Sequence, residues 1–172
     1  MFNKIRSLLG RKLRSGEFDT SIETYWSFQV IRDGKVVQQV KPVHNVTTDA
    51  GRNVARQVLH QAAHGSIAGF DKLTVGSTDY TPVVGNTALT GEVNAGGLER
   101  VSGTYTSEVG VGAWKLETTF TYTGAGVTVF TGAVFNAATG VTMLYAAKFA
   151  ASAVLQSGDQ LKVTVTGTVG AA

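Results

Sequence analysis

The residues of this chain that come closest to a reaction centre are two histidines, His60 and His64, which lie four positions apart. Histidines at that spacing on a helix bind zinc in one class of metalloproteases. The residues between them are Gln61-Ala62-Ala63, so the glutamate that would activate a zinc-bound water is missing, and no third ligand is evident. We therefore predict no metal site and interpret both histidines as exposed residues near the end of a helix.

The sequence likewise predicts no nucleophilic catalysis. A serine, threonine or cysteine nucleophile needs a neighbouring base and an orienting acid. The chain has no cysteine, only three histidines and twelve scattered acidic residues, and it contains no Gly-x-Ser-x-Gly elbow. Gly124-Ala125-Gly126 is not followed by the Gly-Lys-Ser/Thr of a phosphate-binding loop, so it predicts a tight turn. We expect no catalytic residue, no bound cofactor and no enzymatic activity.

The dominant pattern is an alternation of threonine, valine and aromatic residues between residues 98 and 166, as in the Thr-Thr-Phe-Thr-Tyr-Thr of 118–123. A period of two sends neighbouring side chains to opposite faces of a sheet. Glycine-containing turns interrupt the alternation at short intervals, which is typical of sandwiches and barrels. The sequence therefore predicts a mainly β fold, an antiparallel β-sandwich of jelly-roll or immunoglobulin-like type. The strands expected here lie at about 99–109, 113–123, 127–135, 141–149 and 160–168, with a longer connection at 151–159.

The first half of the chain predicts a hairpin, a helix and a short strand. Asp33-Gly34 is a strong signal for a two-residue hairpin turn, because both central residues of a type I′ turn need a positive φ. It predicts paired strands at 22–31 and 35–43. Thr47-Thr48-Asp49 suits the start of a helix that ends at His64-Gly65, with an apolar stripe that should pack on the sheet. A short strand is expected at 70–76.

Composition fits one domain with an added arm. The chain has 172 residues, of which 43% are hydrophobic and only 16% are charged, against about a quarter charged in an average protein. Without cysteine there is neither a disulfide nor a thiolate metal site. No apolar stretch is long enough to span a bilayer, and no secretion signal is recognisable. We therefore interpret the glycosylation-like Asn45-Val46-Thr47 as the start of the helix.

The N-terminal residues form a basic, amphipathic arm. Residues 1–16 carry a charge of +5, whereas the whole chain carries +3, so the rest is slightly acidic. On a helix the apolar residues of 2–14 fall within an arc of roughly 140°. We therefore divide the chain into an arm, 1–20, and a β-sandwich body, 21–172. The candidate docking residues of the arm are Phe2, Lys4, Ile5, Arg6, Leu8, Leu9, Arg11, Lys12, Leu13 and Arg14.

Four interpretations of this arm are open. It can dock on a partner protein through its apolar stripe, lie on an anionic membrane, contact nucleic-acid phosphates, or stay solvated. The apolar stripe favours docking. Apart from Phe2 the arm has no aromatic residue for base stacking, which argues against single-strand binding. We expect no specific nucleic-acid partner and no membrane span.

Several segments of the body occur in an order found in a known group of proteins. The sequence resembles small structural proteins of tailed-bacteriophage virions, which occur as capsid decoration or as tail and fibre components. The likeness covers roughly residues 24 to 168 and depends on order and spacing. The segments that carry it are Arg-Asp-Gly-Lys-Val-Val at 32–37, Asn-Val-Thr-Thr-Asp-Ala-Gly at 45–51, Leu-Thr-Val-Gly-Ser-Thr at 73–78, Thr-Ala-Leu at 87–89 with Glu92, Val-Phe-Asn at 134–136, Met-Leu-Tyr-Ala at 143–146 with Phe149, and Ser-Gly-Asp-Gln-Leu-Lys-Val at 157–163.

The resemblance implies a structural protein of the virion, and we expect a capsid decoration or cement protein. The arm lies outside the resembling segments, and we expect it to anchor the protein on the major capsid protein. One alternative places it in the tail as a fibre, collar or baseplate adaptor, with the arm on a tail ring protein. A second alternative is a carbohydrate-binding β domain in which Trp26, Trp114 and the tyrosines stack on sugars. Exposed strand edges need covering, so we expect a homo-oligomer.

Overall fold

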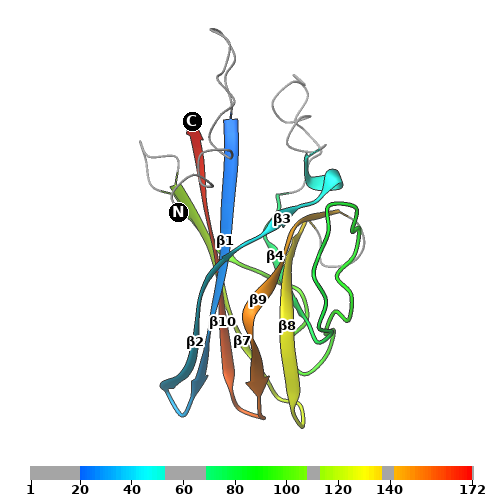
Figure 1. Cartoon of the computed structure of the whole chain (residues 1–172). Coiled ribbons are helices and arrows are strands. Elements are labelled where there is room, and N and C mark those ends of the chain that lie inside the picture. The colour runs from blue at the N-terminus through cyan, green and yellow to red at the C-terminus, as the bar shows by residue number, and fades with distance from the viewer. Residues whose placement is uncertain (1–19, 53–68, 108–112, 137–141, 172) are drawn as a thin grey trace, which may run out of the picture.

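The computed structural model describes residues 20–52, 69–107, 113–136 and 142–171, and these residues are mainly β-strand (Figure 1). In this part of the chain ten strands form two antiparallel sheets of five strands each. The prediction of a mainly β, sandwich-like fold is confirmed. The strands are β1 (Thr20–Arg32), β2 (Lys35–His44), β3 (Val46–Thr47), β4 (Lys72–Gly76), β5 (Val101–Ser102), β6 (Thr104–Ser107), β7 (Ala113–Thr121), β8 (Val127–Phe135), β9 (Met143–Leu155) and β10 (Gln160–Ala171).

Strands far apart in the sequence are neighbours in both sheets. Sheet A has the order β2-β1-β10-β7-β6, and sheet B has the order β3-β9-β8-β4-β5. In sheet A, β1 pairs with β10 from Thr20 opposite Ala171 to Ile31 opposite Gln160. Gly103 separates β5 from β6, so the chain passes there from the edge of sheet B to the edge of sheet A. Both sheets are thus built mainly from long-range pairings.

One apolar core joins the two sheets. The alternation of β1 sends Trp26 and Phe28 inward, and both rings pack near Phe149 of sheet B, with ring centroids 6.2 and 4.9 Å away. A Cβ atom on Gly132 of β8 would lie 2.5 Å from a ring carbon of Trp26, so only glycine lets the backbone come this close. Each such side chain contributes about 1.5–3 kcal/mol on burial. The core therefore sets the spacing of the sheets.

The hairpin between β1 and β2 forms as predicted. Asp33 and Gly34 have φ angles of 50° and 73°, which a type I′ turn requires at both central positions. Residues 49–52 are helical, and Thr48 Oγ1 accepts a hydrogen bond of 3.0 Å from the backbone N–H of Gly51 at the first turn. The predicted continuation of this helix to His64 lies outside the described residues.

Two expected element boundaries are wrong. The strand predicted at about 99–109 is two short strands, β5 and β6, because the chain changes sheets at Gly103. The strand predicted at 141–149 continues as β9 to Leu155, where a long loop was expected. Residues 150–153 are three alanines and a serine, which have a low propensity for β-strands. Burial of Ala153 and Leu155 in the core outweighs it.

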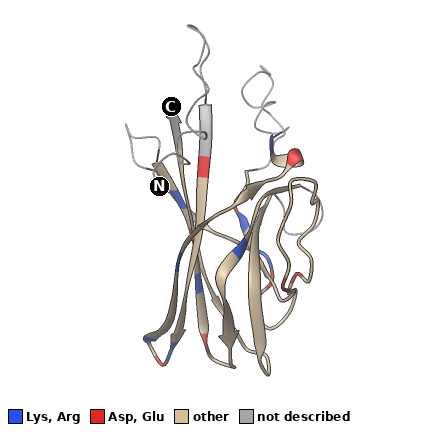
Figure 2. Cartoon of the chain, in the orientation of Figure 1, with Lys and Arg blue, Asp and Glu red and all other residues tan. Residues whose placement is uncertain are grey.

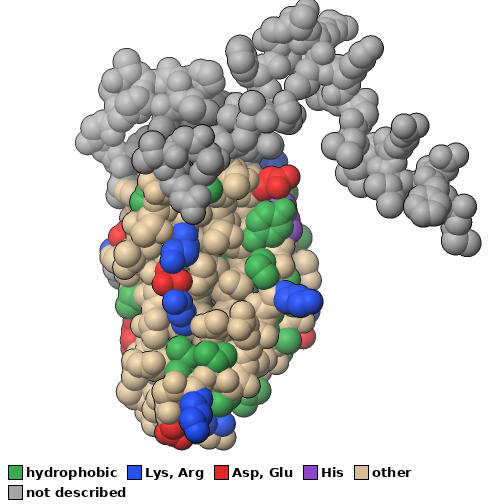
Figure 3. All heavy atoms as spheres, turned by 90° about the vertical axis from the view of Figure 1, so that its left-hand side faces the viewer, with side chains coloured by type: hydrophobic (Ala, Val, Ile, Leu, Met, Phe, Trp, Pro, Cys, Tyr) green, Lys and Arg blue, Asp and Glu red, His purple; other side chains and the backbone are tan. Residues whose placement is uncertain are grey.

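The outer faces of the two sheets differ. The outer face of sheet B is covered by the segment 77–100, under which a second apolar cluster forms around Leu89, Phe135 and Met143. Arg100 closes this cluster, since its guanidinium lies 3.6 Å from the ring centroid of Phe135 and pairs with Glu92. The outer face of sheet A is open, and charges are scattered over the described chain without a large patch of one sign (Figure 2). Figure 3 shows the open face.

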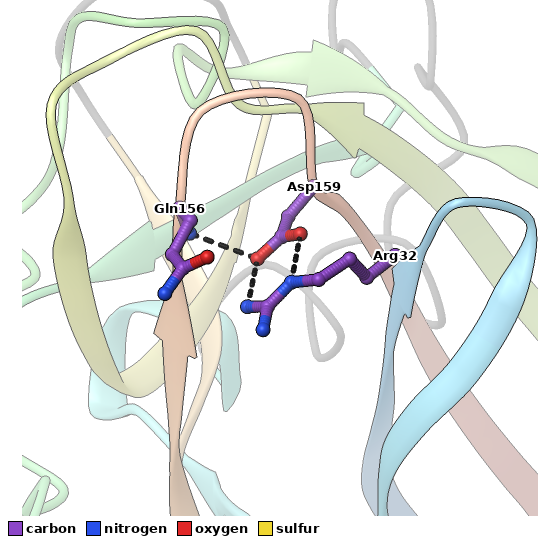
Figure 4. A network of polar contacts seen from close by, with 3 residues as sticks. All are labelled: Arg32, Gln156 and Asp159. Carbon is purple, nitrogen blue, oxygen red and sulfur yellow. Dashed lines mark hydrogen bonds and ion pairs between the residues drawn. The ribbon is translucent and has the colours of Figure 1, made fainter.

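A partly buried ion pair links the hairpin at one end of the sandwich to the turn between β9 and β10 (Figure 4). Arg32 donates from Nε to Oδ1 of Asp159 at 2.8 Å and from Nη2 to Oδ2 at 2.7 Å. The backbone N–H of Gln156 donates to Oδ2 at 2.8 Å. These hydrogen bonds, Arg32 first, lower the pKa of the Asp159 carboxyl to about 2. The turn is therefore held by a charged carboxylate that is almost fully buried.

We predict that this pair makes the free energy of unfolding depend on pH in acid. An aspartate whose pKa is lowered in the folded state stabilises the fold above its unfolded pKa, and this stabilisation is lost as the pH falls. For Asp159 it should be complete above pH ~4 and disappear as the pH falls through about 2. At pH 6, Asp159→Asn should cost about 1.5 kcal/mol, since Arg32 is partly solvent-screened.

Other carboxyl groups titrate in the same range, so the measurement compares two proteins. Urea unfolding of the wild-type chain and of Asp159→Asn between pH 6 and pH 2 gives the difference in unfolding free energy at each pH. The difference should shrink toward zero below pH 3. A difference that stays constant across this range would contradict the assignment.

Candidate functional site

The open face of sheet A is rich in hydroxyl groups. The alternation of β10 places Thr164, Thr166 and Thr168 on this side, opposite the core residues of the same strand. Thr106 of β6 lies beside Thr166 and Thr168 at this face. In Figure 3 the face is mostly tan, neither charged nor hydrophobic, and a short column of basic and acidic side chains crosses it. Such a surface offers many weak hydrogen-bond donors and acceptors and little apolar area.

The charged column on this face is an ion-pair network centred on Glu117. Its Oε1 lies 3.1 Å from Nζ of Lys162, and its Oε2 lies 3.6 Å from Nζ of Lys115. Thr164 Oγ1 donates to Oε2 at 3.1 Å. Partial burial acts to raise the pKa of Glu117, but the bonds from Lys162 and Thr164 outweigh it and hold the pKa below its ordinary value. Glu117 is thus a fixed negative charge between two lysines.

A cavity of about 450 Å³ lies on the same face and borders this network, because Lys115 belongs to both. This volume is within the usual range for small-molecule sites. The ring of Tyr25 borders it and is 37% exposed. The lining combines hydroxyl groups, one ammonium group and two aromatic residues. The lining residues are Tyr25, Thr106, Ser107, Ala113, Trp114, Lys115, Thr166, Gly167 and Thr168.

A second hollow, which we call the aromatic groove, opens between the two sheets and has a volume of about 280 Å³. Unlike the cavity, it is lined by apolar and aromatic side chains from both sheets. Burial raises the pKa of the Tyr145 hydroxyl, so this group stays neutral. The groove is therefore a site for apolar side chains. The lining residues are Phe70, Tyr105, Trp114, Leu116, Val134, Leu144 and Tyr145.

Three aromatic rings form a stack in this groove. The indole of Trp114 lies between Tyr105 and Tyr145, with centroid distances of 6.4 and 6.2 Å and interplanar angles of 24° and 22°. The stack thus crosses from β6 and β7 of sheet A to β9 of sheet B. Tyr105, at the outer end of the stack, is 61% exposed. A folded protein that leaves such a ring in solvent has apolar surface available for a contact.

Gly167 of β10 positions the Trp114 ring. The two residues are paired across β10 and β7, and a Cβ atom on Gly167 would lie 2.4 Å from ring carbons of Trp114. The indole therefore lies directly over the glycine backbone, which holds it at the boundary between the groove and the cavity. Both hollows depend on this one contact.

The sequence-predicted site residues are placed as follows. All ten docking residues of the arm, together with His60 and His64, lie outside the described residues. Trp26 is fully buried in the core, so the idea that it stacks on sugars is wrong; packing against Phe149 and Gly132 explains it. Trp114 does lie at a surface hollow. His44 is on the open face, edge-on to Tyr25 at a centroid distance of 5.3 Å.

The side chain of Asn45, in the glycosylation-like motif, is packed inside the fold. It is buried, and its Oδ1 accepts a hydrogen bond from Thr24 Oγ1. Its backbone N–H donates to the carbonyl of Thr24 at 3.2 Å. These contacts join the end of β2 to β1. The prediction that the helix starts at Asn45-Val46-Thr47 is wrong, because Val46 and Thr47 form β3 by pairing with β9.

Within the described ranges, no group of three histidine, cysteine, aspartate or glutamate side chains could hold a metal ion. No helix in the same part of the chain is long and apolar enough to cross a membrane.

No protein-family model matches the sequence, and no curated protein matches it either. Function therefore has to be inferred from the two hollows, from the arm and from the resemblance described above.

We predict that Gly167→Ala displaces the Trp114 ring. The added methyl group cannot fit beside the indole without movement, and overpacking of this kind costs about 1–3 kcal/mol. Trp26 is buried, so a red shift in tryptophan emission would report on Trp114. Gly85→Ala is the matched control, because nothing lies within 4 Å of its added Cβ. Unchanged emission and stability in Gly167→Ala would contradict the packing described here.

Proposed function

We propose that this protein is a structural protein of a tailed-bacteriophage virion, and specifically a decoration protein of the capsid exterior. The observation that carries the proposal is that the aromatic groove and the start of β1, where the arm joins the body, lie at the same end of the sandwich. The opposite end is closed by the Arg32–Asp159 pair. One end of the body is thus suited to docking, as a passive building block requires.

The arm is the anchor in this proposal, and the major capsid protein is its partner. Burial of each large apolar side chain of the arm supplies about 1.5–3 kcal/mol. Its five cations raise the rate of association with an acidic surface more than the final affinity. Many copies on one particle add avidity, so individually weak contacts suffice. The protein acts in the virion, as a homo-oligomer and without catalysis.

We also propose which type of antiparallel β-sandwich the body is. Jelly rolls and immunoglobulin-like domains are both antiparallel sandwiches. The central antiparallel pairing of β1 with β10 supports a jelly-roll-like variant, in which the first and last strands of the chain are neighbours in one sheet.

We predict that two acidic substitutions on the apolar stripe of the arm, Leu8→Asp with Leu9→Asp, prevent incorporation into particles. The loss of two apolar contacts removes at least about 3 kcal/mol of binding free energy, which corresponds to more than a hundredfold weaker binding. The control is Asn3→Asp with Ser7→Asp, which adds the same charge on the polar face of the arm. Quantitative mass spectrometry of purified particles gives copies per particle.

Normal occupancy of the Leu8→Asp, Leu9→Asp protein would overturn the anchoring role. The copy number of the wild-type protein also separates the capsid from the tail alternative. The resemblance leads us to expect hundreds of copies for a shell coat and a dozen or fewer for most tail parts.

The 450 Å³ cavity favours one second candidate function, carbohydrate binding. Its four hydroxyl side chains and Lys115 offer the hydrogen bonds that sugars use, and the Tyr25 ring offers a stacking surface. We predict that the full-length protein then binds on a glycan array and that Tyr25→Ala abolishes this binding. Tyr25 is outside the core, so the variant should keep the wild-type unfolding midpoint. An array without wild-type binding would exclude this function.

A further inference from the structure

The aromatic groove has the features of a site for a peptide side chain. Its lining is apolar, Tyr105 is 61% exposed, and about 280 Å³ is room for large apolar side chains but not for a whole helix. Apolar anchors that enter such hollows supply most of the affinity of peptide contacts.

The chain carries a suitable occupant in its own N-terminal arm. The five apolar residues of the arm lie on one side of the expected helix, and its charge of +5 is opposite in sign to the slightly acidic remainder of the chain. The groove lining is apolar and aromatic, so arm and groove match in apolar character, and the opposite net charges add only a general attraction.

The geometry of β1 favours the arm of a second copy. Thr24 pairs with Gly167, and Gly167 pairs with Trp114. By ordinary strand spacings the Trp114 backbone then lies about 17 Å from Thr20. The seven steps from Leu13 to Thr20 span at most about 24 Å. However, β1 runs into the body from this end, so an arm that entered its own groove would have to reverse direction and pass β10 to reach β7, with only about 7 Å of chain length left for the turn.

A neighbouring copy that presents its own open end needs no such reversal. We propose that the aromatic groove of each copy binds the apolar side chains of the arm of a second copy, so that the protein assembles through exchanged arms. This inference rests on the docking role of the arm in the proposed function. In the free protein the receiving surface is the aromatic groove of a second copy, namely Tyr105, Trp114 and the residues around them. On the particle the major capsid protein takes its place as the partner of the arm. Contact with a second body also covers the exposed ring of Tyr105.

The absence of cysteine allows a direct test in the purified full-length protein. Two single variants are mixed under mild oxidation: Gly10→Cys, which keeps all five apolar residues of the arm, and Ser107→Cys, which lies beside Trp114 outside the groove lining. A disulfide forms only where the Cα atoms come within about 7 Å. We expect a disulfide-linked dimer of the two variants at tenfold or greater yield than with Val36→Cys, an exposed residue at the opposite end.

A second measurement does not depend on disulfide geometry. In sedimentation velocity, Leu8→Asp with Leu9→Asp should convert the wild-type oligomer to monomer and red-shift the Trp114 emission, whereas Asn3→Asp with Ser7→Asp should do neither. A monomeric wild-type protein, or a disulfide formed within one chain of the Gly10→Cys, Ser107→Cys double variant, would overturn arm exchange.

These experiments use no particles, so the two proposals fail separately. If arm exchange is absent while the acidic arm variant still fails to join particles, the arm docks elsewhere and the proposed function stands. If arm exchange is present but the wild-type protein is absent from particles, the proposed function is wrong and the exchange stands.

Discussion

The close contact of Trp26 with the backbone of Gly132 is the constraint on which the two-sheet structure depends. The indole is fully buried between the sheets, and no larger residue than glycine fits opposite it. This contact fixes how near β8 comes to β1 and lets Phe28 and Phe149 meet edge to face. The aromatic groove inherits this spacing, because its lining residues come from both sheets.

The two ends of the sandwich differ in the kind of side chain that they carry and in how exposed it is. At one end a bidentate ion pair holds the turn of 156–159 against the hairpin, and both oxygens of Asp159 accept hydrogen bonds. At the other end Trp114 lies between Tyr105 and Tyr145, and the outermost ring remains in solvent. The difference gives the body a direction, with its exposed aromatic ring at the end where β1 begins.

Local rules predicted the fold class and the Asp33-Gly34 hairpin, because period-two alternation and positive φ are properties of neighbouring residues. They could not predict where β9 ends, since core contacts decide that against weak propensity in the segment 150–155. Local rules could not predict the aromatic groove either. Tyr105, Trp114 and Tyr145 belong to three strands, and only the register of those strands brings their rings together.

The pairing of β1 with β10 has a consequence for synthesis on the ribosome. β1 can pair with β2 as soon as the hairpin emerges, but its other edge waits for a strand made more than a hundred residues later. Until then an aromatic strand has unpaired amide and carbonyl groups, a state prone to aggregation. Pairings of such long sequence separation also fold slowly. The nascent protein must therefore pass through a late, vulnerable stage in which translation speed and chaperone access govern its yield.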